Sequence, residues 1–271
     1  MEKQKNYEEL TISDYFMFGK ICSKPENRKL ILDALLQIDF QEKEATIEKH
    51  IQAFKDTKYV RLDLLTEDET GTIYDAEMQN EPTNNNAKKE LPQRSRYYQS
   101  ILDTGFFDSG KDYIYLPETY IIFICTYDPF GKGIPVYTFE TKCLETDIPT
   151  YNEKSHKIIF NTTANLENLP TSLKNMLEYI NTSVTTDRAT EMLDIEVKKA
   201  RLREEWKAEY MLTLVHDTDV FRDGFEEGAE SRQPEIDALN HTVAEQTAEQ
   251  KRLTALLISH GIDPNENKTN V

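Results

Sequence analysis

The 271-residue chain is predicted to fold as a mixed α/β sheet flanked by helices, followed by an α-helical C-terminal region. Helical and strand patterns alternate along the first part of the chain, whereas the composition becomes helical past about residue 164. The 38% hydrophobic content is sufficient for a sizeable core, and no apolar run reaches the roughly 18 residues that a membrane span needs. We expect a sheet-containing core at 1–164, a helical extension at 165–230, and an amphipathic or coiled-coil-like helix and tail at 231–271.

The first elements follow from hydrophobic spacing. Between positions 13 and 38, apolar residues recur every three or four positions on either side of Pro25, which predicts two short helices. The next segments are predicted as a strand, a turn, its hairpin partner and a loop, in the order 59–65, 67–71, 72–79 and 80–89.

A helix and three strands complete the predicted core. Residues 91–102 follow the helical period, with Arg94 and Tyr98 on nearly the same face. Residues 119–126 are apolar and β-branched without alternation, which is typical of a strand buried on both sides. The last two strands are expected at 136–143 and 156–161.

The C-terminal region is predicted to be helical. An amphipathic helix is expected from 187 to about 215, and Pro234 is expected to interrupt the helix that follows. From Ile236 to Leu257, seam residues recur at alternating spacings of three and four, with glutamines in the middle. Two alternatives remain open, which are association of helices through this seam and docking of a single amphipathic helix on its own core.

Charge and cysteine usage exclude several classes of protein. The net charge of −17 opposes nonspecific attraction to phosphate backbones, so nucleic-acid binding would need a local basic surface or a metal ion. The polar N-terminal segment lacks the apolar stretch of a signal peptide, which predicts a cytoplasmic protein with no membrane association. Cys22, Cys125 and Cys143 form neither a disulfide framework nor a zinc half-site and are expected to be buried. Scattered histidines and the lack of a Gly-rich phosphate loop disfavour zinc hydrolases and nucleotide hydrolases.

Paired carboxylates are the strongest candidates for chemistry. Asp75, Glu77 and Gln79 share one face of the predicted second hairpin strand, because residues two apart point the same way. Asp63 lies 14 positions before Glu77, so the hairpin is expected to bring these two carboxylates side by side. Two close carboxylates repel unless a cation neutralises them, and Mg²⁺ prefers such oxygen ligands. The alternative is a solvated strand edge, although Asp63 stands between two leucines of an apolar strand.

Four segments of the chain carry a recognisable pattern, which are Lys58 to Leu65 (KYVRLDLL), Asp75 to Gln79 (DAEMQ), Arg94 to Tyr98 (RSRYY) and the opening Ser13 to Phe16 (SDYF). Together they resemble the PD-(D/E)XK nuclease family transposases of the recombination-promoting nuclease (Rpn) type. The resemblance spans about residues 10–230. It implies a restriction-endonuclease-like core in which a hairpin presents an Asp and then an acidic-x-Lys element, which in this branch is typically Glu-x-Gln.

The resemblance also implies roles for individual residues. Asp63 and Glu77 would hold Mg²⁺, with Mn²⁺ as a possible substitute, and the backbone carbonyl of Met78 would complete the ligand set. Gln79 takes the usual lysine position, where its amide can hydrogen-bond the attacking water but carries no positive charge. Arg94 and Tyr98 would contact the scissile phosphate, the alternative being a helix-face arginine and a half-buried tyrosine. A third carboxylate from Glu26 is a further option, although a surface role is favoured for it.

We therefore expect a Mg²⁺-dependent DNA endonuclease that hydrolyses phosphodiester bonds with metal-activated water. DNA would meet the metal ion and local basic residues, which are Lys88, Lys89, Arg94 and Arg96. The alternative is a catalytically weak or inactive nuclease-fold protein that acts as an oligomerising interaction module. In either case, the heptad seam predicts a homo-oligomer joined through the C-terminal helices.

Overall fold

The computed structural model describes residues 5–43, 62–80, 89–107, 110–146, 148 and 152–261. The chain divides into two compact units, Met1–Ala208 and Glu209–Val271. The first unit contains the sheet and most of the helices, and the second consists of most of one long helix. The domain boundaries expected at 164 and 230 stay a prediction.

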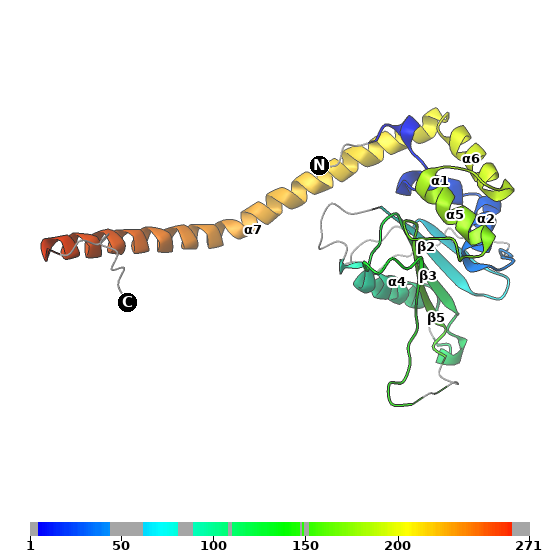
Figure 1. Cartoon of the computed structure of the whole chain (residues 1–271), viewed down its shortest axis with the longest axis horizontal. Coiled ribbons are helices and arrows are strands. Elements are labelled where there is room, and N and C mark those ends of the chain that lie inside the picture. The colour runs from blue at the N-terminus through cyan, green and yellow to red at the C-terminus, as the bar shows by residue number, and fades with distance from the viewer. Residues whose placement is uncertain are drawn as a thin grey trace. The chain divides into compact units, whose positions relative to one another are not determined.

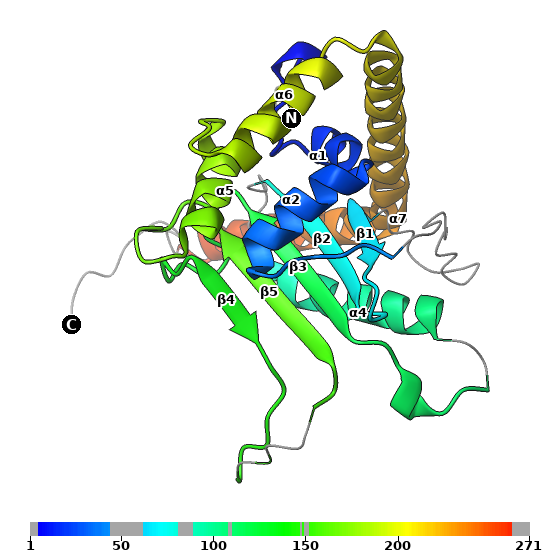
Figure 2. The ribbon, with the colours of Figure 1, turned by 90° about the vertical axis from the view of Figure 1, so that its right-hand side faces the viewer.

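The first unit is built on a five-stranded mixed sheet with the order β1-β2-β3-β5-β4 (Figure 2). The two inner pairs, β2 with β3 and β3 with β5, are parallel, and the edge strands β1 and β4 are antiparallel to their neighbours. The strand bounds are Leu64–Glu67 for β1, Ile73–Gln79 for β2, Thr119–Cys125 for β3, Val136–Phe139 for β4 and Ser155–Asn161 for β5. This arrangement confirms the predicted mixed α/β fold.

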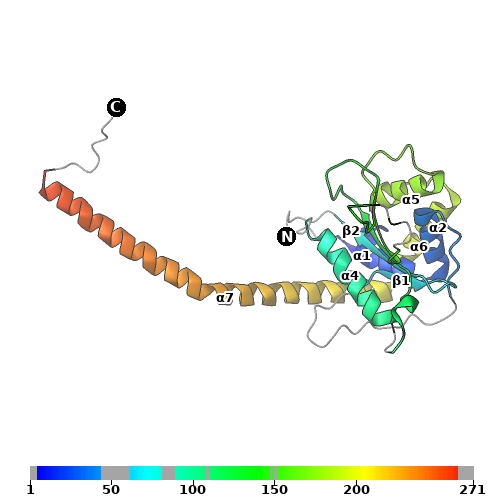
Figure 3. The same ribbon diagram turned by 90° about the horizontal axis from the view of Figure 1, so that it is seen from below.

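Helices cover both faces of the sheet (Figure 3). On one face lies α4 (Leu91–Phe106), and on the other lie α1 (Tyr15–Cys22), α2 (Pro25–Leu36) and α5 (Thr171–Thr182), with α6 (Arg188–Ala200) packed on α1. The two helices predicted around Pro25 are confirmed, since Pro25 is the first residue of α2, where a missing N–H costs no hydrogen bond.

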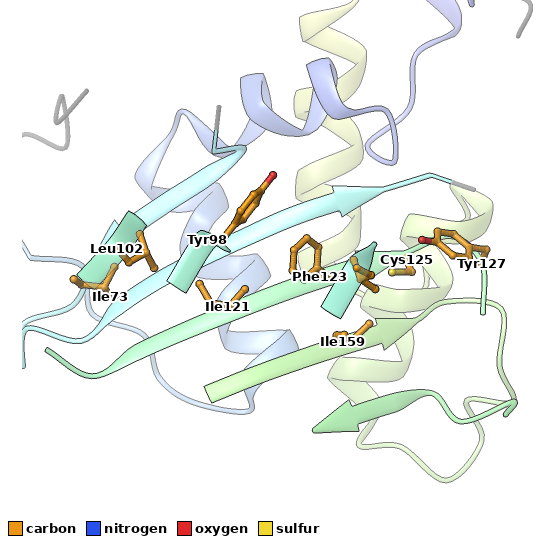
Figure 4. Packing of buried hydrophobic residues seen from close by; sticks show 9 residues of the cluster. Ile73, Tyr98, Leu102, Ile121, Phe123, Cys125, Tyr127 and Ile159 are labelled. Atoms are coloured by element: carbon orange, nitrogen blue, oxygen red, sulfur yellow. The ribbon is translucent and has the colours of Figure 1, made fainter. Parts of the chain in front are cut away.

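The core beneath α4 is made by alternate residues of the central strands. Ile121, Phe123 and Cys125 of β3 are fully buried and pack with Tyr98 and other residues of α4 (Figure 4). The intervening residues of β3 are also buried, on the opposite face, which confirms the prediction of a strand covered on both sides. The face beneath α4 also carries the odd-numbered residues of β2, among them Glu77.

The C-terminal helices differ from the prediction in two ways. The helix expected from 187 to 215 is broken, because α6 ends at Ala200 and α7 (Glu204–Ser259) begins after a short turn. The Tyr7 hydroxyl donates to the Ala200 carbonyl at 2.6 Å, and Nε of Arg201 donates to the Leu10 carbonyl at 2.7 Å, so contacts with the N-terminal segment stabilise the turn.

The predicted interruption at Pro234 is wrong, since α7 continues through this residue as a single helix (Figure 1). A proline inside a helix removes one N–H donor and leaves one carbonyl without its helical partner. Residues 228–250 of α7 are exposed, so water can satisfy that carbonyl. Among the described residues, none of the helices combines the length and the apolar character that crossing a bilayer requires.

Candidate active site

A tight hairpin between β1 and β2 sets the register of the site. Asp68 organises the turn, because its Oδ1 accepts hydrogen bonds from the N–H groups of Thr70 and Thr72 at 2.8 and 3.0 Å. Gly71 adopts a φ of 86°, which a residue without a Cβ adopts at little cost. The resulting register pairs Leu64 with Ala76.

This register places Asp63 opposite Glu77, as predicted. Asp63 lies one residue before β1, and its backbone N–H donates to Glu77 Oε1 at 2.9 Å. In return, the backbone N–H of Met78 donates to Asp63 Oδ2 at 3.0 Å. Each carboxylate is therefore oriented by the main chain of the other strand, and the two side chains are on the same side of the sheet.

β1 begins later than predicted. It starts at Leu64 and runs to Glu67, into the segment expected as a turn, and Asp68 forms a bridge with Glu42. The earlier part of the expected strand, residues 59–61, lies outside the described residues, as do Lys58 and Lys88. The pairing of the two acids does not depend on this shift, because the register that pairs Leu64 with Ala76 brings Asp63 opposite Glu77.

A third carboxylate, Asp75, lies two residues before Glu77 on the same face of β2. Asp75 is 0% exposed and Glu77 is 2% exposed, and both oxygens of Asp75 lack a hydrogen-bond partner among the described residues. Burial raises the pKa of both side chains well above their ordinary values, and the charges of the neighbouring carboxylates raise the pKa of Glu77 further. The site thus concentrates acidic groups that a nearby cation would stabilise.

The donor set suits a hard divalent cation. Among the described residues, no group of three or more His, Cys, Asp or Glu side chains is arranged to enclose a metal ion. Mg²⁺ needs fewer protein ligands, because it typically takes one or two carboxylates and completes its shell with waters and substrate phosphate oxygens. Asp63 and Glu77 fit that requirement. The Met78 carbonyl accepts a hydrogen bond from Nε2 of Gln79 at 2.8 Å and has a second lone pair, so its role as a third ligand stays a prediction.

Arg94 and Tyr98 extend the site from the neighbouring helix. One guanidinium nitrogen of Arg94 donates to Oε1 of Gln79, and the other donates to the Tyr98 hydroxyl at 3.0 Å. Burial and the charge of Glu77 raise the pKa of Tyr98 to about 12, so its hydroxyl keeps its proton at neutral pH. The structure therefore brings Asp63, Glu77, Gln79, Arg94 and Tyr98 together beneath the start of α4.

Other predicted residues lie outside this group. Glu26 is exposed in the first turn of α2, a helix on the other face of the sheet, in agreement with the surface role favoured for it. Lys89 and Arg96 are exposed near the start of α4. Asp75 lies on the face predicted for it, although no role was predicted for this residue. The strict alternation Asp75, Glu77, Gln79 was the signal that this residue belongs with the site.

A mixed sheet with helices on both faces, and an Asp and a Glu-x-Gln element paired in a hairpin, define a PD-(D/E)XK nuclease-like α/β fold. The family model described as PD-(D/E)XK nuclease family transposase matches residues 12–200, more than two thirds of the chain, and the chain belongs to this family. Neither a curated protein nor a solved structure matches it. The family supports a nuclease-like function, and its members generally use divalent metal ions.

Proposed function

We propose that this protein is a Mg²⁺-dependent DNA endonuclease that acts in the cytoplasm and hydrolyses phosphodiester bonds. The observation that carries the proposal is the apposition of Asp63 and Glu77, each oriented by a backbone N–H of the opposite strand. Membership of a nuclease family and the resemblance to recombination-promoting nucleases agree with this activity and with a role in DNA recombination.

Different residues of the site would bind the metal ion and the phosphate. Asp63 and Glu77 provide the carboxylate oxygens that hold the cation, and the hairpin keeps both on one face. A bound Mg²⁺ ion would supply an activated water and neutralise charge on the phosphate oxygens. Arg94 offers guanidinium N–H groups to the phosphate, since this planar fork matches phosphate geometry. Burial of Glu77 keeps bulk water away from one side of the metal ligands.

The test is cleavage of supercoiled plasmid in Mg²⁺, Mn²⁺ or chelator. We expect nicking or cutting with either metal and none with chelator. Asp63→Ala and Glu77→Ala should each lower the rate about 1000-fold, several kcal/mol of transition-state stabilisation. Glu77→Gln keeps the buried shape and should lose activity equally, while Glu69→Gln, in the exposed turn, should behave as the parent. Cleavage that survives both alanine substitutions would refute the proposal.

A second candidate function is that of an oligomerising interaction module. It is favoured by the seam of α7, where Leu239 and Val243 are each 58% exposed and Leu253 is 51% exposed. Two copies of the seam would bury these side chains in a coiled coil, in which Gln246 and Gln250 form a weaker polar centre. The partner that we propose is therefore a second copy of this chain.

Light scattering on the full chain tests the module. We expect Leu239→Asp together with Leu253→Asp to reduce the mass to that of a monomer, and a chain truncated at Pro234 to do the same. Ala248→Asp and Ala255→Asp add the same charge to positions outside the seam and should leave the mass unchanged. A parent that is already monomeric at micromolar concentration would exclude self-association through this seam.

A further inference from the structure

Gln79 is engaged at both ends of its amide. Its Nε2 donates to the Met78 carbonyl at 2.8 Å, and its Oε1 accepts from the Arg94 guanidinium. A lysine amine and an amide differ in that only the amine carries a positive charge. With both ends of the amide bonded to protein groups, Gln79 is arranged to hold Arg94 and the main chain, and one N–H and one oxygen lone pair of the amide remain for other partners.

Arg94 is held as a rigid charge beside the acids. It stands in the first turn of α4, and the carbon of its guanidinium is 5.5 Å from the Tyr98 ring centre and 5.6 Å from that of Phe123. Phe123 is the β3 residue paired with Glu77, so these contacts place the guanidinium next to the metal-binding face.

The charge of Arg94 is directed at the site. In the part of the chain that the structure describes, Arg94 forms no ion pair, and its two side-chain hydrogen bonds go to the uncharged Gln79 and Tyr98. Its positive charge nevertheless acts on Glu77 and Asp75, whose pKa values it lowers against the larger effect of burial. A half-buried guanidinium whose only side-chain partners are neutral retains donors and charge for an anion.

We propose that Arg94 supplies the positive charge that the lysine supplies in an acidic-x-Lys element, and that Gln79 is the positioning residue that aims it. The ligand is the phosphate group of the DNA backbone. Since an arginine keeps its proton in proteins, Arg94 acts by stabilising negative charge on the phosphate, and proton removal from water is left to other groups. This inference rests on the proposed nuclease function and specifies how its substrate is held.

Moving the positive charge from position 94 to position 79 by mutation tests the inference. Arg94→Gln should lower kcat/KM about 100-fold, the usual effect of removing one donor to developing charge. Adding Gln79→Lys to the Arg94→Gln variant should raise kcat/KM again by at least about tenfold, because it returns one positive charge to the same place. Gln79→Lys alone should lower activity, since it removes the acceptor of Arg94 and adds a like charge. Arg188→Gln, an exposed arginine on α6, controls for net charge and should match the parent.

Binding measurements without turnover separate this role from a structural one. In calorimetric titration with Ca²⁺ alone, Arg94→Gln should bind the cation severalfold more tightly, because a repelling charge is gone. Fluorescence anisotropy with a labelled DNA duplex in Ca²⁺ should show that the Arg94→Gln variant binds DNA more weakly than the parent. If Arg94 had only a structural role, the Arg94→Gln substitution would weaken the binding of Ca²⁺ and of DNA alike.

The outcomes distinguish the two proposals. The inference is overturned if the double variant is no better than Arg94→Gln, if Gln79→Lys alone exceeds the parent, or if Arg94→Gln weakens Ca²⁺ binding. A parent that binds no Ca²⁺ and cuts no DNA in Mg²⁺ overturns the nuclease function itself. A parent that cuts DNA while the Arg94 variants fail these expectations overturns only the role of Arg94.

Discussion

Replacing the buried Asp75 by asparagine should stabilise the core by about 2 kcal/mol at pH 8 in the presence of chelator. The Cα atoms of Asp75 and Glu77, which are two residues apart on one strand, are about 6.7 Å apart. Two unit charges at that distance repel by about 2.5 kcal/mol at an effective dielectric constant of about 20, and burial further disfavours the Asp75 charge. Asparagine keeps the shape of the side chain and removes this repulsion. For a folded unit of this size, the gain corresponds to an increase in Tm of about 4–8 °C.

The pH dependence follows from the raised pKa of Asp75. Because burial raises this pKa above the ordinary 3.8, the unfolded chain loses the proton at a lower pH than the folded chain does. Stability that is present below about pH 4 is therefore lost as the pH rises toward the folded pKa. Removing the Asp75 charge also lowers the pKa of Glu77, because that charge is one of the causes that raise it, and this adds to the advantage of the variant. The advantage of Asp75→Asn should consequently grow between pH 5 and pH 8.

Thermal unfolding followed by circular dichroism at these two pH values is the assay. Asp112→Asn changes the same group at an exposed position and should leave Tm within about 1 °C of the parent. If Asp75→Asn lowers Tm at pH 8, or if its advantage shrinks with rising pH, then the Asp75 carboxylate is stabilised in the folded chain and the reasoning is refuted.

Three further outcomes are expected. At pH 8, iodoacetamide followed by mass spectrometry should label Cys143, which is partly exposed, and leave Cys125 unmodified, because burial raises the pKa of Cys125 to about 12; equal labelling would contradict the burial. Asp187→Ala should cost about 1 kcal/mol by urea unfolding, since its side chain caps α6 at 2.8 Å, and Asp187→Asn should be nearly neutral; equal losses would contradict a capping role. Phe123→Ala should cost about 3–5 kcal/mol in the same assay, because the ring is fully buried, and a loss below about 1 kcal/mol would be inconsistent with that packing.

The parts of the fold that were predictable depend on short-range patterns. The apposition of Asp63 and Glu77 follows from the two-residue strand period and a hairpin that closes within 14 residues. The helices around Pro25 and the doubly buried β3 could also be predicted from the sequence, because each pattern lies within one element. The contradicted expectations depended on distant groups or on solvent. The break after Ala200 needs Tyr7, which is 193 positions away, and no local signal at residue 200 shows that contact.

In the candidate site, too, features within one strand were predictable and contacts between distant elements were not. Residues of one strand could be assigned to one face, but the hydrogen bond between Gln79 and Arg94 requires that α4 packs with its first turn over the end of β2. From the sequence, separate roles were predicted for these two residues, Gln79 at the attacking water and Arg94 at the phosphate. The structure joins them, because the placement of a helix on a sheet depends on the packing of Tyr98 and Phe123, which a single-sequence pattern does not reveal.

The turn held by Asp68 and Gly71 makes the chemistry of this protein sensitive to loop length. Inserting or deleting one residue there would shift the alignment of β1 and β2 by one place. Asp63 would then point to the other face of the sheet, away from Glu77. The remaining three strands and their helices do not involve that turn. A single codon gained or lost at the hairpin tip would thus separate the acids while most of the scaffold stayed intact, so one such event would remove the proposed nuclease activity and keep the protein.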